Sequence, residues 1–298
     1  MTVAYIAYQK LTPAAKAKVD ALLTRNPDYN TWVMQIPDTP ANKDLRALTA
    51  FLRAALWADD IKGEAGYRDV GAVINGVMNV NRPPNNPEAG QNIGYTDTLR
   101  HRYWHFHDTP FSSDHTTTQP AETPSALTQI PKMRDALAMS TDQDLQSYDL
   151  VWLIHLVGDV HQPLHSAQRF TATQPAGDSG GNDVKLCSTS PSCSQNLHSL
   201  WDGLFGTGLD PDAAMSLGQD LLDEASGPPA KASISDPAVW IDESFKLAKS
   251  RAYAAPIKKD GSKSPTSAAY RTKAHQTGEK QVLLGGYRLA NLINGALH

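Results

Sequence analysis

The sequence lacks the features that mark a membrane protein, a repeat protein or a basic nucleic-acid reader. No apolar run approaches the ~20 residues of a membrane span, no internal repeat is visible, and the formal net charge is −4. This charge argues against binding nucleic acid through a basic patch, although bound divalent cations would reverse the local sign. With 40% apolar and 19% charged residues in 298, the composition predicts a soluble globular protein with a sizeable core.

Cysteine is also scarce, with only Cys187 and Cys193 in a polar loop. Their spacing around a proline predicts a disulfide that closes a small loop, and therefore an oxidising compartment. Two free thiols are the alternative. No signal peptide precedes Met1 and no Asn-x-Ser/Thr acceptor occurs, which fits a bacterial source better than a fungal one. We expect a secreted or periplasmic protein whose signal peptide has been left off, with a cytosolic protein as the alternative.

Helix signals recur along the whole chain. Helices are expected at 13–23, 42–61 and 267–294, and a capping-box pattern at 140–143 precedes a central helix. Four further signals share a cap residue followed by proline, which fits a helix start. They are Thr12-Pro13, Thr123-Pro124, Asp210-Pro211 and Asp236-Pro237. The expected fold is all-α, a single compact multi-helix domain spanning 1–298, with at most a short β-hairpin near 183–200.

The chain is organised around the apolar helix at 151–165. His155 and Asp159 are four residues apart, so their side chains project from the same helix face. Their neighbours are apolar nearly all round, which predicts a buried helix. A buried carboxylate needs a partner, and a metal ion satisfies an aspartate and a histidine together. Pro163 ends the helix and places His165 just beyond it.

A second His-x-x-x-Asp pair and two isolated residues complete a candidate ligand set. A lone buried histidine is more often a core residue than a ligand. Two His-x-x-x-Asp pairs in one chain, however, seldom arise by chance. Imidazole and carboxylate are zinc ligands, and seven exceed what one tetrahedral ion needs, so two or more ions are expected. The candidates are Asp59, His105, His155, Asp159, His165, His198 and Asp202. By contrast, the surface histidines are expected to be His101, His115, His275 and His298.

These residues resemble the zinc-dependent single-strand-specific nucleases typified by the fungal S-one and P-one enzymes, in the phospholipase C/nuclease P-one superfamily. The resemblance covers most of the chain and rests on the segments 57–59, 104–108, 155–165, 180–182, 196–202 and 286–290. It implies one zinc held by Asp59, His105, His155 and Asp159, and a second held by His165, His198 and Asp202, with Asp159 bridging to a third.

The start of the chain departs from the family pattern. The family's third zinc is bound by an N-terminal Trp and a following Gly-His, whereas Met1–Ala7 resembles the segment just after that histidine. The resemblance therefore supports two zinc sites here, and a third if the N-terminal segment is restored. A start assigned too late is favoured over a reduced site, because the predicted disulfide implies export and the other ligands are intact.

The resemblance also assigns residues to the substrate. Phe106 would stack on a nucleobase and Asp108 would bond to its edge, although the residues alone favour a core Phe beside a capping Asp. Lys62 stands where the family usually has an Arg that touches the phosphate, so the charge is kept and the bidentate fork is lost. Asn182 is a candidate to orient a ligand or a substrate phosphate, and a Gly-Gly-Asn turn is the alternative.

The expected reaction is metal-assisted hydrolysis of a phosphodiester, with Asp59, Lys62 and Asp159 as catalytic residues. The resemblance implies single-stranded DNA and RNA as substrates and 5′-mononucleotides as products, and it leaves 3′-nucleotidase activity open. One alternative is a zinc phospholipase C, against which Asp202 and the Phe106/Asp108 pair argue. Another is a catalytically silent protein that binds zinc or single strands. No protein partner is implied, and a monomer is expected.

Overall fold

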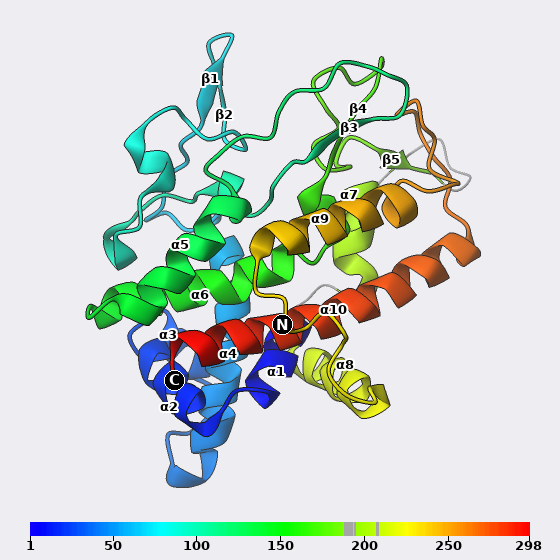
Figure 1. Ribbon diagram of the computed structural model, residues 1–298. Coiled ribbons are helices and arrows are strands. Elements are labelled where there is room, and N and C mark those ends of the chain that lie inside the picture. Colours follow the sequence, from blue (N-terminus) through cyan, green and yellow to red (C-terminus); the bar gives the residue numbers. More distant parts are fainter. Residues whose placement is uncertain (188–192, 194, 207–208) are drawn as a thin grey trace.

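The computed structural model describes residues 1–187, 193, 195–206 and 209–298. Helices dominate these residues, and the strands form only two-stranded sheets (Figure 1), so the predicted all-α class is confirmed. The α-helices are α1 (Thr2–Gln9), α2 (Pro13–Leu23), α3 (Tyr29–Val33), α4 (Lys43–Asp60), α5 (Ala126–Met139), α6 (Gln143–Asp159), α7 (Leu197–Asp202), α8 (Pro211–Glu224), α9 (Pro237–Leu247) and α10 (Ala268–Ala296).

Short helical turns and strands connect these helices. The 3-10 turns are η1 (Pro40–Asn42), η2 (Pro87–Gly90), η3 (Gly94–Thr96), η4 (Arg102–Trp104), η5 (Pro163–Ser166) and η6 (Gly203–Phe205), and η7 (Ala248–Ala252) is a π-helical turn. The strands are β1 (Ala72–Ile74), β2 (Val77–Asn79), β3 (Pro110–Ser112), β4 (Gln168–Phe170), β5 (Lys185–Leu186) and β6 (Gln195–Asn196). No helix in the described ranges combines the length and the apolar character needed to cross a membrane.

Helix α6 lies at the centre of the helical body and packs against α2, α4, α5 and α10 (Figure 1). Every side chain from Ser147 to Val157 is buried, as the apolar character of the sequence predicted. The cap of this helix is Asp142, whose carboxylate accepts hydrogen bonds from the backbone N–H groups of Asp144 and Leu145. The helix therefore begins two residues later than a box opening on Ser140 would place it.

Three of the four predicted cap-and-proline starts are confirmed. The side chains of Thr12, Asp210 and Asp236 each accept a hydrogen bond from the first turn of the helix that follows. Thr123-Pro124 instead precedes a cap at Ser125, whose backbone N–H donates to the Thr128 hydroxyl at 3.1 Å. The final helix α10 also matches the sequence prediction, and α7 begins with a capping box at Asn196 that was not predicted.

The small sheets include one that was predicted and two that were not. Strands β5 and β6 form the antiparallel hairpin expected near 183–200. The unpredicted β1–β2 hairpin turns at Asn75-Gly76, both at positive φ. Strands β3 and β4 pair in parallel, with Pro110 opposite Gln168. This last pair holds the segment after His105 beside the segment after His165, which assembles the site described below.

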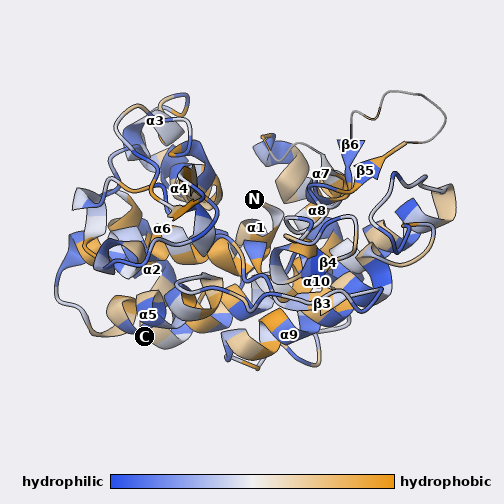
Figure 2. Cartoon of the chain, turned by 90° about the horizontal axis from the view of Figure 1, so that it is seen from above, coloured by the Kyte–Doolittle hydropathy of each residue, from blue (hydrophilic) through white to orange (hydrophobic). Residues whose placement is uncertain are grey.

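The buried apolar side chains form two clusters. The larger one surrounds α6 and includes residues of α1, α2, α4, α5 and the end of α10. The smaller one joins η5, α7, η7 and the start of α10. Seen from above, α3 and α4 lie on one side of the molecule and α7 with β5 and β6 on the other, and the start of the chain lies between them (Figure 2).

Aromatic rings fill the core between α4 and α6. Trp57, Trp104 and Trp152 are fully buried and meet edge to face. His101 belongs to this group, because its ring stacks on Trp104 with centroids 3.5 Å apart and bonds to Asp97 at 2.8 Å. The predicted surface position of His101 is therefore wrong, whereas His115, His275 and His298 are exposed as expected.

Candidate metal centre

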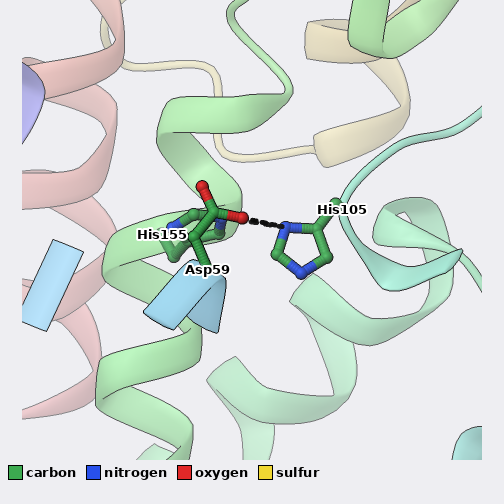
Figure 3. A group of neighbouring side chains, drawn as sticks. All are labelled: Asp59, His105 and His155. Atoms are coloured by element: carbon green, nitrogen blue, oxygen red, sulfur yellow. Dashed lines mark hydrogen bonds and ion pairs between the residues drawn. The ribbon is translucent and has the colours of Figure 1, made fainter. Parts of the chain in front are cut away.

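Three predicted ligands meet at the junction of α4, the 105–109 segment and α6. Asp59, His105 and His155 each present one ligand atom, and these atoms lie within 4.8 Å of one another (Figure 3). The Asp59 Oδ1 atom is 3.7 Å from His105 Nδ1 and 3.8 Å from His155 Nε2. The two imidazole nitrogens are 2.9 Å apart. Two imidazoles and a carboxylate converging on one point form a donor set that suits zinc.

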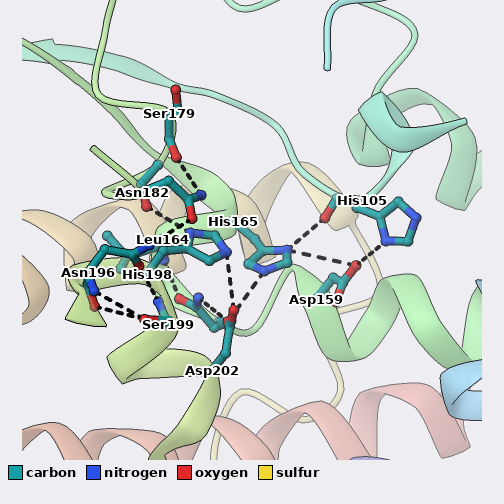
Figure 4. Close-up of polar contacts among 12 residues, drawn as sticks. His105, Asp159, Leu164, His165, Ser179, Asn182, Asn196, His198, Ser199 and Asp202 are labelled. Carbon is teal, nitrogen blue, oxygen red and sulfur yellow. Dashed lines mark hydrogen bonds and ion pairs between the residues drawn. The ribbon is translucent and has the colours of Figure 1, made fainter. Parts of the chain in front are cut away.

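A second triad forms where η5 meets α7. His165, His198 and Asp202 also present ligand atoms within 4.8 Å of one another. The Asp202 carboxylate lies 3.7 Å from His165 Nε2 and 3.4 Å from His198 Nε2 (Figure 4). The i, i+4 spacing along α7 places His198 and Asp202 on one face, and the turn after Pro163 brings His165 to them.

Asp159 lies between the two triads. Its Oδ2 atom is 3.0 Å from His155 Nε2 and 3.1 Å from His105 Nδ1, and it is 3.8 Å from His165 Nδ1. One carboxylate therefore faces histidines of both groups, and Figure 4 shows its contacts with His105 and His165. Because Asp159 is the last residue of α6, its carboxylate lies between His155 on that helix and His165 in the turn that follows.

Backbone carbonyls orient three of the four histidines. The Nδ1 atoms of His155, His165 and His198 lie 2.7, 2.9 and 2.8 Å from the carbonyl oxygens of Ala55, His105 and Gly180. A carbonyl only accepts, so each Nδ1 carries the proton and each Nε2 is the atom available to a metal. Such outer hydrogen bonds fix the tautomer and the ring orientation of metal-binding histidines.

A glycine turn supports the second triad. Gly180 has φ +60°, and a Cβ there would lie 2.8 Å from the carbonyl oxygen of Leu164. The turn is anchored by buried Asp178, whose carboxylate accepts from the backbone N–H groups of Arg169 and Gly181 and from the Tyr253 hydroxyl. This arrangement aims the Gly180 carbonyl at His198, and no local sequence pattern signals the Asp178 anchor.

The site combines ionised carboxylates with histidines of two kinds. Burial opposes ionisation of Asp59, but His155 and His105 outweigh it and lower its pKa to about 2. The pKa values of Asp159 and Asp202 are lowered in the same way, against burial, by the neighbouring histidines. These three carboxylates are therefore ready to bind a cation without losing a proton.

The histidines divide according to their carboxylate neighbours. Burial opposes the charged form of His155 and His165, but Asp159 outweighs it, so the pKa of His155 is raised and that of His165 rises to about 10. Burial lowers the pKa of His105 to about 3, and burial together with His165 lowers the pKa of His198. The amino group of Met1 is also buried in this region, which lowers its pKa to about 6 against the attraction of Asp159.

The predicted substrate residues line a cleft that opens onto the metal ligands. A cavity of about 620 Å³ is bordered by His105, His165 and His198. All four candidates lie along it: Lys62, Phe106, Asp108 and Asn182. The Lys62 ammonium is paired with Asp59. Burial raises the pKa of Asp108 to about 7, with Asp178 acting in the same direction.

Two polar contacts at the site were not predicted from the sequence. The Gln162 amide donates to Asp202 Oδ1 at 2.8 Å and so positions a ligand of the second triad. His161 is buried, with Nδ1 at 2.7 Å from the Val157 carbonyl and Nε2 facing Arg288 at 3.1 Å, so it faces away from the triads. Gln162 lies 40 residues from Asp202 in the chain and His161 lies 127 residues from Arg288, so no local pattern signals these two contacts.

The comparison with protein families agrees with this geometry. The family model described as S1/P1 Nuclease matches residues 1–298. No curated protein matches the chain. The family is metal-dependent and hydrolyses ester bonds of nucleic acids, and each of the two triads is a group of side chains that could hold a metal ion for such a reaction. The chain therefore belongs to the S1/P1 nuclease family.

Proposed function

We propose that this chain is a zinc-dependent endonuclease that hydrolyses single-stranded DNA and RNA to 5′-mononucleotides, and that residues 1–298 act as one domain. The observation that carries the proposal is the position of Asp159, whose carboxylate faces histidines of both triads. Shared carboxylates hold paired metal ions at the short spacing that phosphoryl transfer uses. The donor types favour zinc over magnesium, which prefers oxygen ligands.

The triads, Asp159 and Lys62 would have different roles in the hydrolysis of a phosphodiester bound in the cleft. Zinc held by the two triads would supply Lewis acidity next to the scissile phosphate. Asp59 and Asp159 hold the negative charge that keeps the ions in place. Lys62 lines the cleft next to Asp59 and offers its ammonium to the phosphoryl oxygens. A lysine is a point charge rather than a fork, so phosphate binding is weaker than an arginine would give.

The other cleft residues favour an unpaired base. The Phe106 ring packs on the core with one part open to the cleft, and a base stacks on such a ring whatever its identity. Asp108 lies two residues on and offers a carboxyl group to the edge of the base. Stacked base pairs expose neither face nor Watson–Crick edge, so this pair supports single strands over duplexes. The Asn182 amide donates to the Ser179 carbonyl, which holds it at the rim as a candidate phosphate contact.

The disulfide and the start of the chain bear on location and metal number. Cys187 and Cys193 are bonded to each other, which supports an oxidising, secreted or periplasmic location. A third zinc would need the Trp and Gly-His segment that family members carry before the equivalent of Met1. We propose that ligands of this kind, if placed beside Asp159, would complete a third site. The proposal treats the protein as a monomer.

The first test is release of mononucleotides from single-stranded DNA and RNA, with and without a chelator. We expect release that a chelator abolishes and added zinc restores. Zinc retention without any release, also after a Trp and Gly-His segment is added before Met1, would identify a catalytically silent zinc protein instead. Phosphatidylcholine as a parallel substrate separates the phospholipase alternative, since the proposal predicts no hydrolysis of it.

A further inference from the structure

The β1–β2 hairpin carries apolar side chains that are exposed and pack against neither buried cluster. Its four large side chains are exposed, with relative exposures of 71% for Val73, 37% for Ile74, 70% for Val77 and 49% for Met78. None of the four belongs to the two buried clusters of the described residues. The hairpin projects from the helical body (Figure 1). Exposed apolar groups gathered in this way mark a surface that binds something.

The turn of the hairpin is built to hold its shape. Asn75 and Gly76 have φ values of 52° and 81°, the positive pair that an Asn-Gly two-residue turn favours. The register pairs Ile74 with Val77 and Val73 with Met78. Paired residues share one face of a two-stranded sheet, and successive pairs alternate between faces. The hairpin therefore has one face with Ile74 and Val77 and an opposite face with Val73 and Met78.

Only the first of these faces meets the cleft. Ile74 and Val77 line the same cavity as His105, Phe106 and His165, whereas Val73 and Met78 do not line it. We name Ile74 and Val77 the cleft face and Val73 and Met78 the outer face. The cleft face is thus continuous with the candidate metal centre, although Ile74 precedes His105 by 31 positions in the chain.

Polar contacts close the base of the hairpin and join it to the 119–122 segment of the cleft. The Ala72 backbone N–H donates to the Arg82 carbonyl at 2.8 Å. The Arg82 guanidinium pairs with Glu122 and lies 3.4 Å from Gln119, in a segment that also lines the cleft. Arg100 and Arg102 share the single carboxylate of Asp69, at 2.8 and 2.6 Å, so Asp69 balances only one of their two positive charges. Arg102 itself lines the cleft.

We propose that the cleft face of the hairpin is a further subsite for the substrate strand, where nucleotides beyond the scissile phosphate place their bases on Ile74 and Val77. The inference rests on the proposed function, because the occupant is the same single strand. Continuity with the cleft and the positive charge at Arg102 favour a polyanion with apolar bases over a protein segment. A flexible single strand exposes its base faces to such a surface, and a duplex does not.

The test compares two matched double variants on two substrates. Ile74→Ser with Val77→Ser removes the cleft face, and Val73→Ser with Met78→Ser removes the outer face by the same chemistry. We expect the cleft-face variant to lose about tenfold in kcat/KM on a twelve-nucleotide single strand, mainly through KM, and to keep wild-type kcat/KM on a dinucleotide. The outer-face variant should match wild type on both. Equal losses on both substrates, or no loss on the longer one, would overturn the inference.

A binding measurement separates this inference from the proposed function. If the wild-type protein hydrolyses neither substrate, the proposed function fails, and the subsite is then judged by anisotropy of a labelled phosphorothioate twelve-mer on the zinc-loaded protein. Weaker binding by the cleft-face variant than by the outer-face variant supports the subsite, and equal binding refutes it. Sedimentation is the last check, because a change of mass in the cleft-face variant alone would assign the hairpin to self-association.

Discussion

Asp159 is the residue on which the proposed metal centre depends most. Replacing it with Asn keeps the shape and removes the charge that both triads share. We expect Asp159→Asn to lower single-strand hydrolysis at least a hundredfold, about 3 kcal/mol in the barrier, and to retain less zinc. Hydrolysis rates and metal analysis of the purified protein provide the measurement. Asp242→Asn, on the exposed face of α9, is the control, and an Asp159 variant with near-control activity would disprove the shared role.

The histidine pKa values predict how metal affinity depends on pH. The pKa of His165 is raised to about 10, so at neutral pH this ring carries an Nε2 proton that zinc must displace, and the pKa of His155 is shifted in the same direction. Raising the pH removes the competing proton, and affinity therefore rises with pH until these pKa values are passed. His105 and His198, with lowered pKa values, contribute no proton.

We therefore expect zinc binding near neutral pH to release at least one proton, that of His165, from the protein. Calorimetry in two buffers of different ionisation enthalpy counts the released protons, and a chelator-competition assay follows the affinity. An affinity that does not change between about pH 6 and about pH 8 would contradict this assignment.

At this scale the sequence predicted what is local. The spacing of His155 and Asp159, and of His198 and Asp202, placed each pair on one helix face without any knowledge of the fold. The first triad also needed Asp59 and His105, which entered the candidate set as isolated residues and which the family resemblance then assigned to the first zinc. The burial of His101 could not be predicted, because it depends on stacking against Trp104 and on the Asp97 carboxylate, and neither contact follows a helical period.

Among the elements, the turn at Gly180 has the clearest link to the site. An alanine there would adopt a positive φ and press its Cβ on the Leu164 carbonyl. We expect Gly180→Ala to lower the free energy of unfolding by about 1 to 3 kcal/mol, and to weaken zinc binding at the second triad because the turn orients His198. Denaturant melts and zinc titration measure both effects. The control is Gly66→Ala, where an added Cβ meets nothing within 4 Å, and a Gly180 variant as stable as this control would argue against the strain.

Helix caps were predictable and sheet pairings were not. Thr12, Asp210 and Asp236 bond to N–H groups within their own first turn, so the signal lies in adjacent residues. Strands β3 and β4 pair although more than fifty residues separate them in the chain, and the sequence of neither three-residue strand predicts this pairing. The β1–β2 hairpin carried an Asn-Gly turn signal, but its strands lack the alternation that a half-buried sheet shows.

For the whole molecule, metal binding is expected to couple the two buried clusters. The first triad is held by α4 and α6, which belong to the larger cluster, and the second by η5 and α7, which belong to the smaller one. Zinc binds the folded chain and not the unfolded one, so each site at a hundredfold excess over Kd adds about 2.7 kcal/mol. We expect thermal melts to shift several degrees upward with zinc and back with a chelator. Asp159→Asn should reduce the shift, and the same shift in both proteins would exclude coupling through Asp159.

Stability of the metal-free protein should also depend on one buried carboxyl group in α6. Asp149 is fully buried and its two oxygens have no hydrogen-bond partner among the described residues. Burial raises its pKa to about 8, with Asn92 and Lys132 acting in the opposite direction. Folded chains then keep the proton that unfolded chains have lost, so stability should fall from about pH 5 to about pH 8, by at most about 1.4 kcal/mol per pH unit.

Denaturant unfolding in chelator at several pH values measures this slope. Asp149→Asn cannot ionise, so its stability should fall less over the same interval. Asp135→Asn, an exposed position on α5, should retain the wild-type slope. Parallel pH profiles for all three proteins would show that Asp149 titrates normally.

The parallel pairing of β3 with β4 has a consequence for the order in which the protein matures. The strands that bring His105 to His165 are separated in the chain by α5 and α6. Two residues of the second triad, His198 and Asp202, lie still later in the chain, on α7. During synthesis or export, the chain must therefore be extended as far as Asp202 before all the candidate ligands can come together. The zinc content of a preparation should therefore report the fraction of correctly folded molecules. Molecules in which β3 and β4 are not paired would bind less zinc and could be separated from the native protein on that basis.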